Sequence, residues 1–248
     1  MTEPESREAH GKLEKQLETL PVKPPDNAKQ SDKKAYSETV SRVLALAVAA
    51  ELRDRGLEET LPTESGLSRG SGAERRLAGG IGAKKVDVTW STEDGGLMLA
   101  FSVKTINFRD KRSGNFQKNL TNRRGDLLFE CITLHQRFPF AVLVGLFLLD
   151  AAAKQDQTDA RSSTFSNAHR RLKLFDGRAD REGRDEQFEQ LYVVTLDTSG
   201  EKPAVKFYRV GQENKDLCFD QVVEDTLRAV AMRNPDFYEF EGGKLTKL

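Results

Sequence analysis

Histidine, cysteine and tryptophan are scarce: the 248 residues include three histidines, two cysteines and one tryptophan. His10, His135 and His169 are far apart in the chain, and no Cys or His pair has the spacing of a zinc site. Cys131 and Cys218 each stand among apolar residues, which favours buried free thiols in a reducing compartment. We therefore expect neither zinc chemistry nor a disulfide-stabilised fold.

Net charge and long apolar runs are also lacking. The 39 Lys and Arg residues balance 39 Asp and Glu residues, so any affinity for nucleic acid must come from a local basic patch. The longest apolar run, residues 138–149, is shorter than the roughly 20 residues of a transmembrane helix. No apolar signal segment opens the chain, and neither a P-loop nor a GxSxG nucleophile elbow occurs. We expect a cytoplasmic protein without membrane contacts.

Composition divides the chain into an accessory segment and one domain. Residues 1–32 are rich in Glu, Lys and Pro, which predicts a flexible or loosely docked N-terminal arm. Residues 33–248 are predicted to form a single domain, with its core in 33–150. Seven glycines within 56–82 favour a loop there, and a C-terminal hairpin plus helix is predicted over 189–234.

The periodicity of the core predicts an α/β fold. Apolar residues recur at helical spacing over 33–55 and again over 116–136. Between these helices, residues 86–104 alternate as a hairpin does, and the run FAVLVGLFLL that follows the second helix suits a central strand. This order predicts a mixed central β-sheet flanked by helices.

The predicted hairpin brings an acid and a lysine together. Asp94-Gly95 is a favoured two-residue turn, and closing it would pair residues whose numbers sum to 189. Asp87 would then lie opposite Ser102 and diagonal to Lys104, all on one face of the sheet. A slip of one residue would move Asp87 to the other face.

This arrangement resembles the core of the PD-(D/E)XK nucleases, the superfamily with the restriction-endonuclease-like fold. Asp87 matches the first acid of the family signature and Lys104 matches its lysine, but Ser102 stands where the family usually has glutamate. The type II restriction enzymes that cut around CCGG also carry Ser-x-Lys, and they take the missing acid from the following helix. The resemblance covers roughly residues 33–150.

The resemblance implies a Mg²⁺ site with a relocated acid. The segment NRRGDLLFE offers Asp126, which is favoured because it follows Arg124 closely, and Glu130, four residues later, as the substitute. Glu38 in the first helix is a further candidate catalytic acid. The implied site therefore comprises Asp87 and Asp126 or Glu130 as metal ligands, with Lys104 beside the attacked phosphate.

A basic segment directly follows the predicted lysine. Its cations alternate with amides that bind phosphates or base edges, and the predicted DNA-binding residues are Arg109, Lys111, Arg112, Lys118, Asn119, Arg123 and Arg124. A second basic cluster, within 170–184, is diluted by acids and is interpreted as a solvated surface.

Together these features predict a Mg²⁺-dependent endonuclease acting on double-stranded DNA, of the restriction or phage-defence kind. A homodimer is expected because two symmetric sites cut two strands most simply. Singly, Asp87 and Lys104 also fit exposed charges of a half-solvated sheet. The alternatives are a non-catalytic nucleic-acid-binding or assembly protein on a degenerate nuclease fold, and an effector nuclease activated by a partner that contacts the 1–32 arm or the 56–82 loop.

Overall fold

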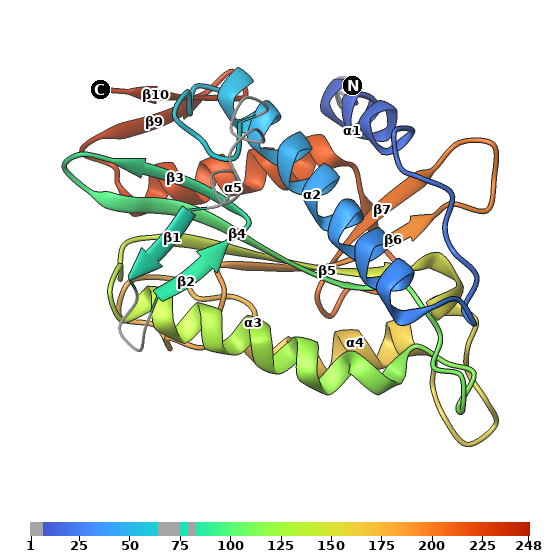
Figure 1. The fold of residues 1–248 in the computed structure, drawn as a ribbon. Coiled ribbons are helices and arrows are strands. Elements are labelled where there is room, and N and C mark those ends of the chain that lie inside the picture. The colour runs from blue at the N-terminus through green and yellow to red at the C-terminus, as the bar shows by residue number, and fades with distance from the viewer. Residues whose placement is uncertain (1–6, 64–74, 79–82) are drawn as a thin grey trace.

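A six-stranded mixed sheet forms the centre of the computed structural model, which describes residues 7–63, 75–78 and 83–248 (Figure 1). In spatial order its strands are β3 (Val88–Thr92), β4 (Gly96–Ile106), β5 (Val142–Asp150), β6 (Gln190–Asp197), β7 (Ala204–Arg209) and β8 (Asp216–Leu217). The five α-helices described are α1 (Glu8–Leu17), α2 (Gln30–Asp54), α3 (Leu120–His135), α4 (Thr164–Leu172) and α5 (Phe219–Arg233). The predicted mixed sheet flanked by helices is confirmed.

The strand directions follow from the connections. The pair β3–β4 is a hairpin and antiparallel, whereas β4–β5 and β5–β6 are parallel and are joined through α3 and α4. The β6–β7 pair is antiparallel, which confirms the hairpin predicted within residues 189–234.

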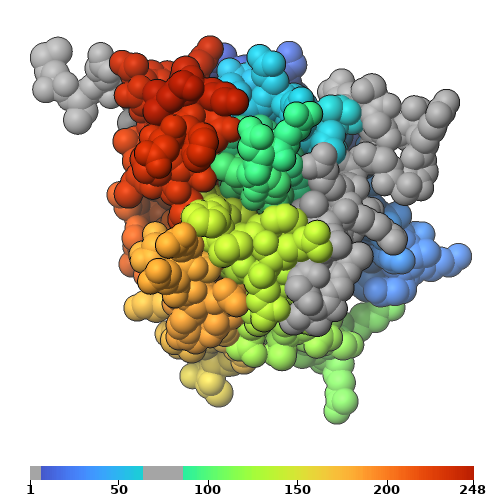
Figure 2. All heavy atoms as spheres, turned by 90° about the vertical axis from the view of Figure 1, so that its left-hand side faces the viewer, coloured from blue at the N-terminus to red at the C-terminus, as the bar shows by residue number. Residues whose placement is uncertain are grey.

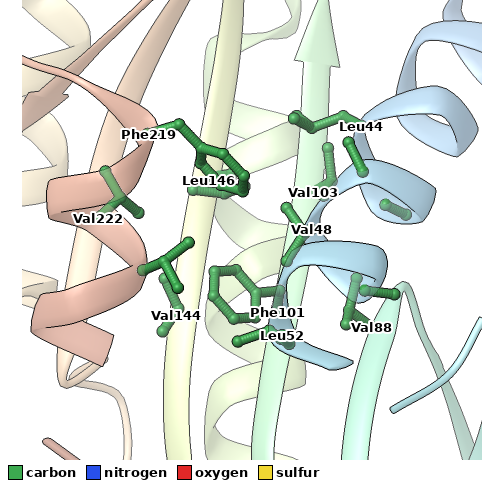
Figure 3. Packing of buried hydrophobic residues seen from close by; sticks show 14 of the residues in the cluster. Leu44, Val48, Leu52, Val88, Phe101, Val103, Val144, Leu146, Phe219 and Val222 are labelled. Atoms are coloured by element: carbon green, nitrogen blue, oxygen red, sulfur yellow. The ribbon is translucent and has the colours of Figure 1, made fainter. Parts of the chain in front are cut away.

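Helices cover both faces of the sheet. One apolar cluster unites α1, α2 and α5 with one face, and a second unites α3 and α4 with the other (Figure 1). In the first cluster Leu44 and Val48 of α2 pack with Phe101 and Val103 of β4 (Figure 3). Burial on both faces explains why β5 reads as a continuous apolar run.

The N-terminal helix is docked more firmly than predicted for residues 1–32. Leu13 and Leu17 of α1 are each about 1% exposed and belong to the first apolar cluster. The buried carboxylate of Asp220, on α5, accepts hydrogen bonds from the backbone N–H groups of Ala9 and His10 at 3.1 and 3.0 Å. The leucine spacing alone could not reveal this anchor, because its acceptor lies more than 200 residues away.

The β3–β4 register matches the prediction, but the turn does not. Val88 pairs with Phe101 and Trp90 with Leu99, numbers that sum to 189. The turn, however, spans residues 93–95 rather than Asp94-Gly95 alone, and an irregularity between Trp90 and Ser91 restores the predicted pairing. The register near the site is therefore right for a reason that the sequence did not show.

Two further hairpins lie outside the main sheet. β1 (Arg75–Ala78), inside the stretch predicted to be a loop over 56–82, pairs with β2 (Ala83–Val86), which directly follows that stretch; residues 64–74 and 79–82 of the predicted loop lie outside the described residues. β9 (Tyr238–Glu241) and β10 (Lys244–Lys247) form a C-terminal hairpin, where Tyr238 contacts Trp90 edge-on with ring centroids 5.3 Å apart. Figure 2 shows the C-terminal segment beside the end of the β3–β4 hairpin.

None of the described helices is long and apolar enough to cross a membrane.

Candidate functional site

The candidate site lies where β4 extends beyond the end of its neighbour β3, near the edge of the sheet. The last β3–β4 pair is Val88 with Phe101, so among the described residues no strand pairs with the remainder of β4 on that side. Asp87, in the bend between β2 and β3, partly replaces the missing strand, because its Oδ2 atom accepts a hydrogen bond from the backbone N–H of Val103 at 2.7 Å. This bond fixes the predicted acid against the predicted Ser-x-Lys segment.

A large open cleft of about 1790 Å³ covers this edge. The end of β4, residues 103–106, forms its floor. One wall is the N-terminal half of α2 with the residues just before it; the other is the β4–α3 connection and α3. Asn107 Nδ2 donates to Ser37 Oγ at 3.1 Å, which ties the α2 wall to the end of the floor.

Inside the cleft, Glu130 of α3 contacts both Ser102 and Lys104. Ser102 Oγ donates to Glu130 Oε2 at 2.7 Å, and Lys104 Nζ lies 2.8 and 2.9 Å from the two carboxylate oxygens. The side chains of Lys104 and Glu130 are only 13% and 11% exposed, so their attraction is screened less than that of a surface pair. Ser102 and Lys104 can share one acid because alternate residues of a strand point to the same face.

The other predicted acids have different partners. Asp126, the acid that the sequence favours, is half exposed and pairs with Arg123 at 3.3 Å. Glu38 lines the cleft but is 68% exposed, and its nearest cation is Lys34 at 3.8 Å. The structure thus brings Asp87, Ser102, Lys104 and Glu130 together and leaves Asp126 and Glu38 further out on the cleft walls. The preference for Asp126 is not supported by these contacts.

Most of the predicted DNA-binding residues line the cleft. Those that do are Arg109, Lys111, Lys118, Asn119 and Arg123. Arg112 and Arg124 do not line it, because Arg112 lies further out in the exposed turn and Arg124 lies on another side of α3. Lys118 pairs with Asp110 at 2.6 Å, and this bond, with the Ser113 N–H, lowers the pKa of Asp110 to about 2.

Sequence reasoning named Glu38 of the α2 wall but missed the cations of this wall. Its cleft-lining cations are Lys29, Lys33, Lys34 and Arg42. The apolar periodicity of 33–55 drew attention to the buried face of this helix, whereas the polar residues at positions 34, 38 and 42 form a stripe at four-residue spacing on another face. That stripe was the available signal.

The cleft is locally basic although the chain has no net charge. Its cationic lining residues are Lys29, Lys33, Lys34, Arg42, Lys104, Arg109, Lys111, Lys118 and Arg123. Its anionic lining residues are Glu38, Asp87, Asp110, Asp126 and Glu130. Nine cations against five anions give this surface an excess of four positive charges, which attracts polyanions.

The donor set suits a hard divalent cation. The carboxylates of Asp87 and Glu130 both accept hydrogen bonds from the segment 102–104, so two acids converge on one short stretch of β4. Mg²⁺ is commonly bound by one or two carboxylates and keeps several waters. Within the described part of the chain no group of three or more His, Cys, Asp or Glu residues could hold a metal.

Comparison with known proteins adds no family to this picture: no protein-family model, curated protein or solved structure matches the chain.

Proposed function

We propose that the protein is a Mg²⁺-dependent endonuclease that hydrolyses phosphodiester bonds of double-stranded DNA. One observation carries the proposal: Asp87, Lys104 and Glu130 line a basic cleft at the open edge of β4, where Glu130 also contacts the buried Ser102. Two carboxylates beside a lysine can hold a metal ion and stabilise the charge that develops in phosphodiester hydrolysis, and the surrounding cations suit a polyanionic substrate.

Each residue has a distinct role in this proposal. Asp87 and Glu130 would hold the metal, and Ser102 orients the Glu130 carboxylate by donating to Oε2. When bound, Mg²⁺ would lower the pKa of an attacking water and offset charge on the phosphate. Lys104, released in part from Glu130, would donate to a phosphate oxygen and stabilise the charge that develops there.

The order of elements supports a restriction-endonuclease-like core. A helix (α2), a hairpin (β3–β4), a crossover helix (α3) and a parallel strand (β5) follow one another as the resemblance implies, with the acid–lysine site on the hairpin. The relocated acid is then Glu130, since Ser102 occupies the position of the usual glutamate.

A role in restriction or phage defence, in the cytoplasm and as a homodimer, is part of the same proposal. Each chain carries one candidate site, and a two-fold dimer would present one site to each strand of a duplex. Size-exclusion chromatography with light scattering would measure the oligomeric state.

A second function, binding of nucleic acid without cleavage, is favoured by one observation. Glu130 is engaged by both Ser102 and Lys104, so the acid–lysine pair could simply stabilise the wall of a binding cleft. An effector nuclease that needs a partner would share the same site.

The deciding experiment is incubation of purified protein with mixed-sequence duplex DNA and Mg²⁺, with EDTA as one control. Lys104→Ala is expected to slow cleavage about 100-fold or more, because it removes the cation beside the phosphate. Lys15→Ala is the matched control, since Lys15 is an exposed α1 residue that does not line the cleft.

The outcomes separate the candidates. Discrete fragments that need Mg²⁺ and Lys104, but not Lys15, would establish the nuclease. Tight DNA binding without cleavage under any divalent cation would favour the binding protein, and cleavage that appears only with a further component would favour the effector.

A further inference from the structure

Arg42 is an exposed cation on the α2 wall of the cleft, and no described residue gives its guanidinium a hydrogen bond or an ion pair. Three other cations of the cleft are engaged: Lys104 with Glu130, Lys118 with Asp110 and Arg123 with Asp126. The charge of Arg42 is therefore available to a ligand in a way that these charges are not.

The packing of α2 places Arg42 at the level of the acid–lysine site. Leu44, two residues later, belongs to the apolar cluster that contains Val103, and the two residues lie close together in Figure 3. Two residues correspond to about 3 Å along a helix and to about 200° of rotation, so Arg42 lies at the level of the β4 stretch that carries Lys104 but on the side of α2 away from Leu44, where it lines the cleft. Glu130 faces the same stretch from the α3 wall.

The α2 wall is also held in place. Besides the Ser37–Asn107 hydrogen bond, Asp26 Oδ1, just before α2, accepts from the Arg109 N–H at 3.0 Å. Both contacts join the α2 side of the cleft to the segment that leaves β4. A ligand bound by Arg42 would therefore keep a fixed distance from the floor of the cleft.

We infer that Arg42 binds a phosphate of the substrate strand from the α2 wall, so that the strand is held between α2 and α3. This inference rests on the proposed nuclease function. Lys104 shares its charge with Glu130, so a phosphate beside it lacks full neutralisation, and a guanidinium supplies a fork of donors that fits two phosphate oxygens. Lys29 and Lys34 extend the same wall for the flanking phosphates.

The test measures binding rather than cleavage. The affinity of a short fluorescein-labelled duplex is measured by fluorescence anisotropy in EDTA, and again in Ca²⁺, over a series of KCl concentrations. Arg42→Ala is expected to weaken binding about tenfold at low salt, as the loss of one charge-assisted contact does. The slope of log Kd against log salt should fall by about one, because one phosphate contact is lost.

Two variants make the result specific. Arg42→Lys keeps the charge but loses the fork, so it should retain the salt slope and recover part of the affinity. Lys15→Ala removes a cation outside the cleft lining and should leave both the affinity and the slope unchanged.

The failures of the inference and of the proposed function are distinguishable. If Arg42→Ala binds the duplex like the wild-type protein, with the same slope, the inference is overturned while cleavage that depends on Lys104 still supports the nuclease. If the wild-type protein binds no duplex in either buffer and cleaves none, both are overturned. Weaker binding by Arg42→Ala and Lys15→Ala alike would reflect bulk charge and would also overturn the inference.

Discussion

Glu130 and Asp126 are four residues apart on α3, yet they have different partners and should have different importance. Glu130→Gln is expected to reduce cleavage about 100-fold, because it removes the charge of a proposed metal ligand that contacts Ser102 and Lys104. Asp126→Asn should retain most of the activity, since Asp126 is half exposed and pairs with Arg123. Initial rates with duplex DNA and Mg²⁺ measure the difference.

Glu38→Gln provides a second matched control on the opposite wall. Its carboxylate is 68% exposed and lies near Lys34 rather than Lys104, so near-normal cleavage is expected. Thermal unfolding of each variant separates a lost site from a lost fold. Equal losses in Glu130→Gln and Asp126→Asn would contradict the assignment, and a large loss in Glu38→Gln would place the metal nearer α2.

The identity of the relocated acid could have been recovered from the sequence in part. Glu130 falls three residues after Leu127 and four before Leu134, inside the buried stripe of α3, and it is only 9% exposed. An acid at a core-facing position needs a partner, and Lys104 on the adjoining strand supplies one. The prediction relied instead on the closeness of Asp126 to Arg124 in the sequence. Asp126 and Glu130 share one helix face but lie about 6 Å apart along the helix axis, so they contact different partners.

At the scale of elements, the sequence predicted the helices and strands that are determined by the pattern of apolar residues within each segment. Apolar periodicity located α2 and α3 to within a few residues, and the parallel strand β5 followed from its continuous apolar run. The three-residue β3–β4 turn, the irregularity at Trp90 and the capping of α1 by Asp220 depend on contacts between distant segments or on fine backbone geometry. The α2 wall of the cleft belongs to this second group, because it exists only once α2 lies beside β4.

The docking of α1 yields a prediction at the same scale. Leu13→Ala is expected to lower the free energy of unfolding by about 2–5 kcal/mol, because Leu13 is 1% exposed and its removal leaves a cavity against α2 and α5. Lys15→Ala on the exposed side of the same helix should change it by less than about 0.5 kcal/mol. Chemical denaturation of both variants measures these values, and equal stabilities would mean that α1 is the loosely docked arm predicted from composition.

Across the whole molecule, charge is balanced in total but distributed unevenly. The cleft carries four more cations than anions while the chain carries none in excess, so the remaining surface must be acidic to the same extent. With this charge distribution, a polyanion is attracted to the cleft and repelled by the rest of the surface, so it is oriented toward the cleft instead of adhering anywhere on the protein. The composition could exclude a uniformly basic protein, but it could not show the segregation, which depends on α2, β4 and α3 meeting at one edge.

Stability against acid is the remaining property of the whole molecule that the structure predicts. His169 of α4 is 1% exposed and its Nδ1 atom accepts from the Gly211 N–H; burial, together with nearby Lys154, lowers its pKa from 6.5 to about 4. Between those two values the unfolded chain binds a proton that the folded chain does not. The stabilisation from the neutral ring is therefore complete above pH 6.5 and is lost as the pH falls toward 4, by at most about 3 kcal/mol.

His169→Asn isolates this contribution, because its amide oxygen can still accept from the Gly211 N–H. Burial raises the pKa of Asp176 and Asp225, so these carboxylates take up protons more readily in the folded chain than in the unfolded one and oppose the trend at low pH, but both are present in the variant and cancel in the comparison. Denaturation of the two proteins from pH 7 to pH 4.5 should show that the wild-type protein loses more stability than the variant. Parallel curves would mean that His169 is protonated as readily in the folded chain as in the unfolded one, and the acid sensitivity would then belong to other groups.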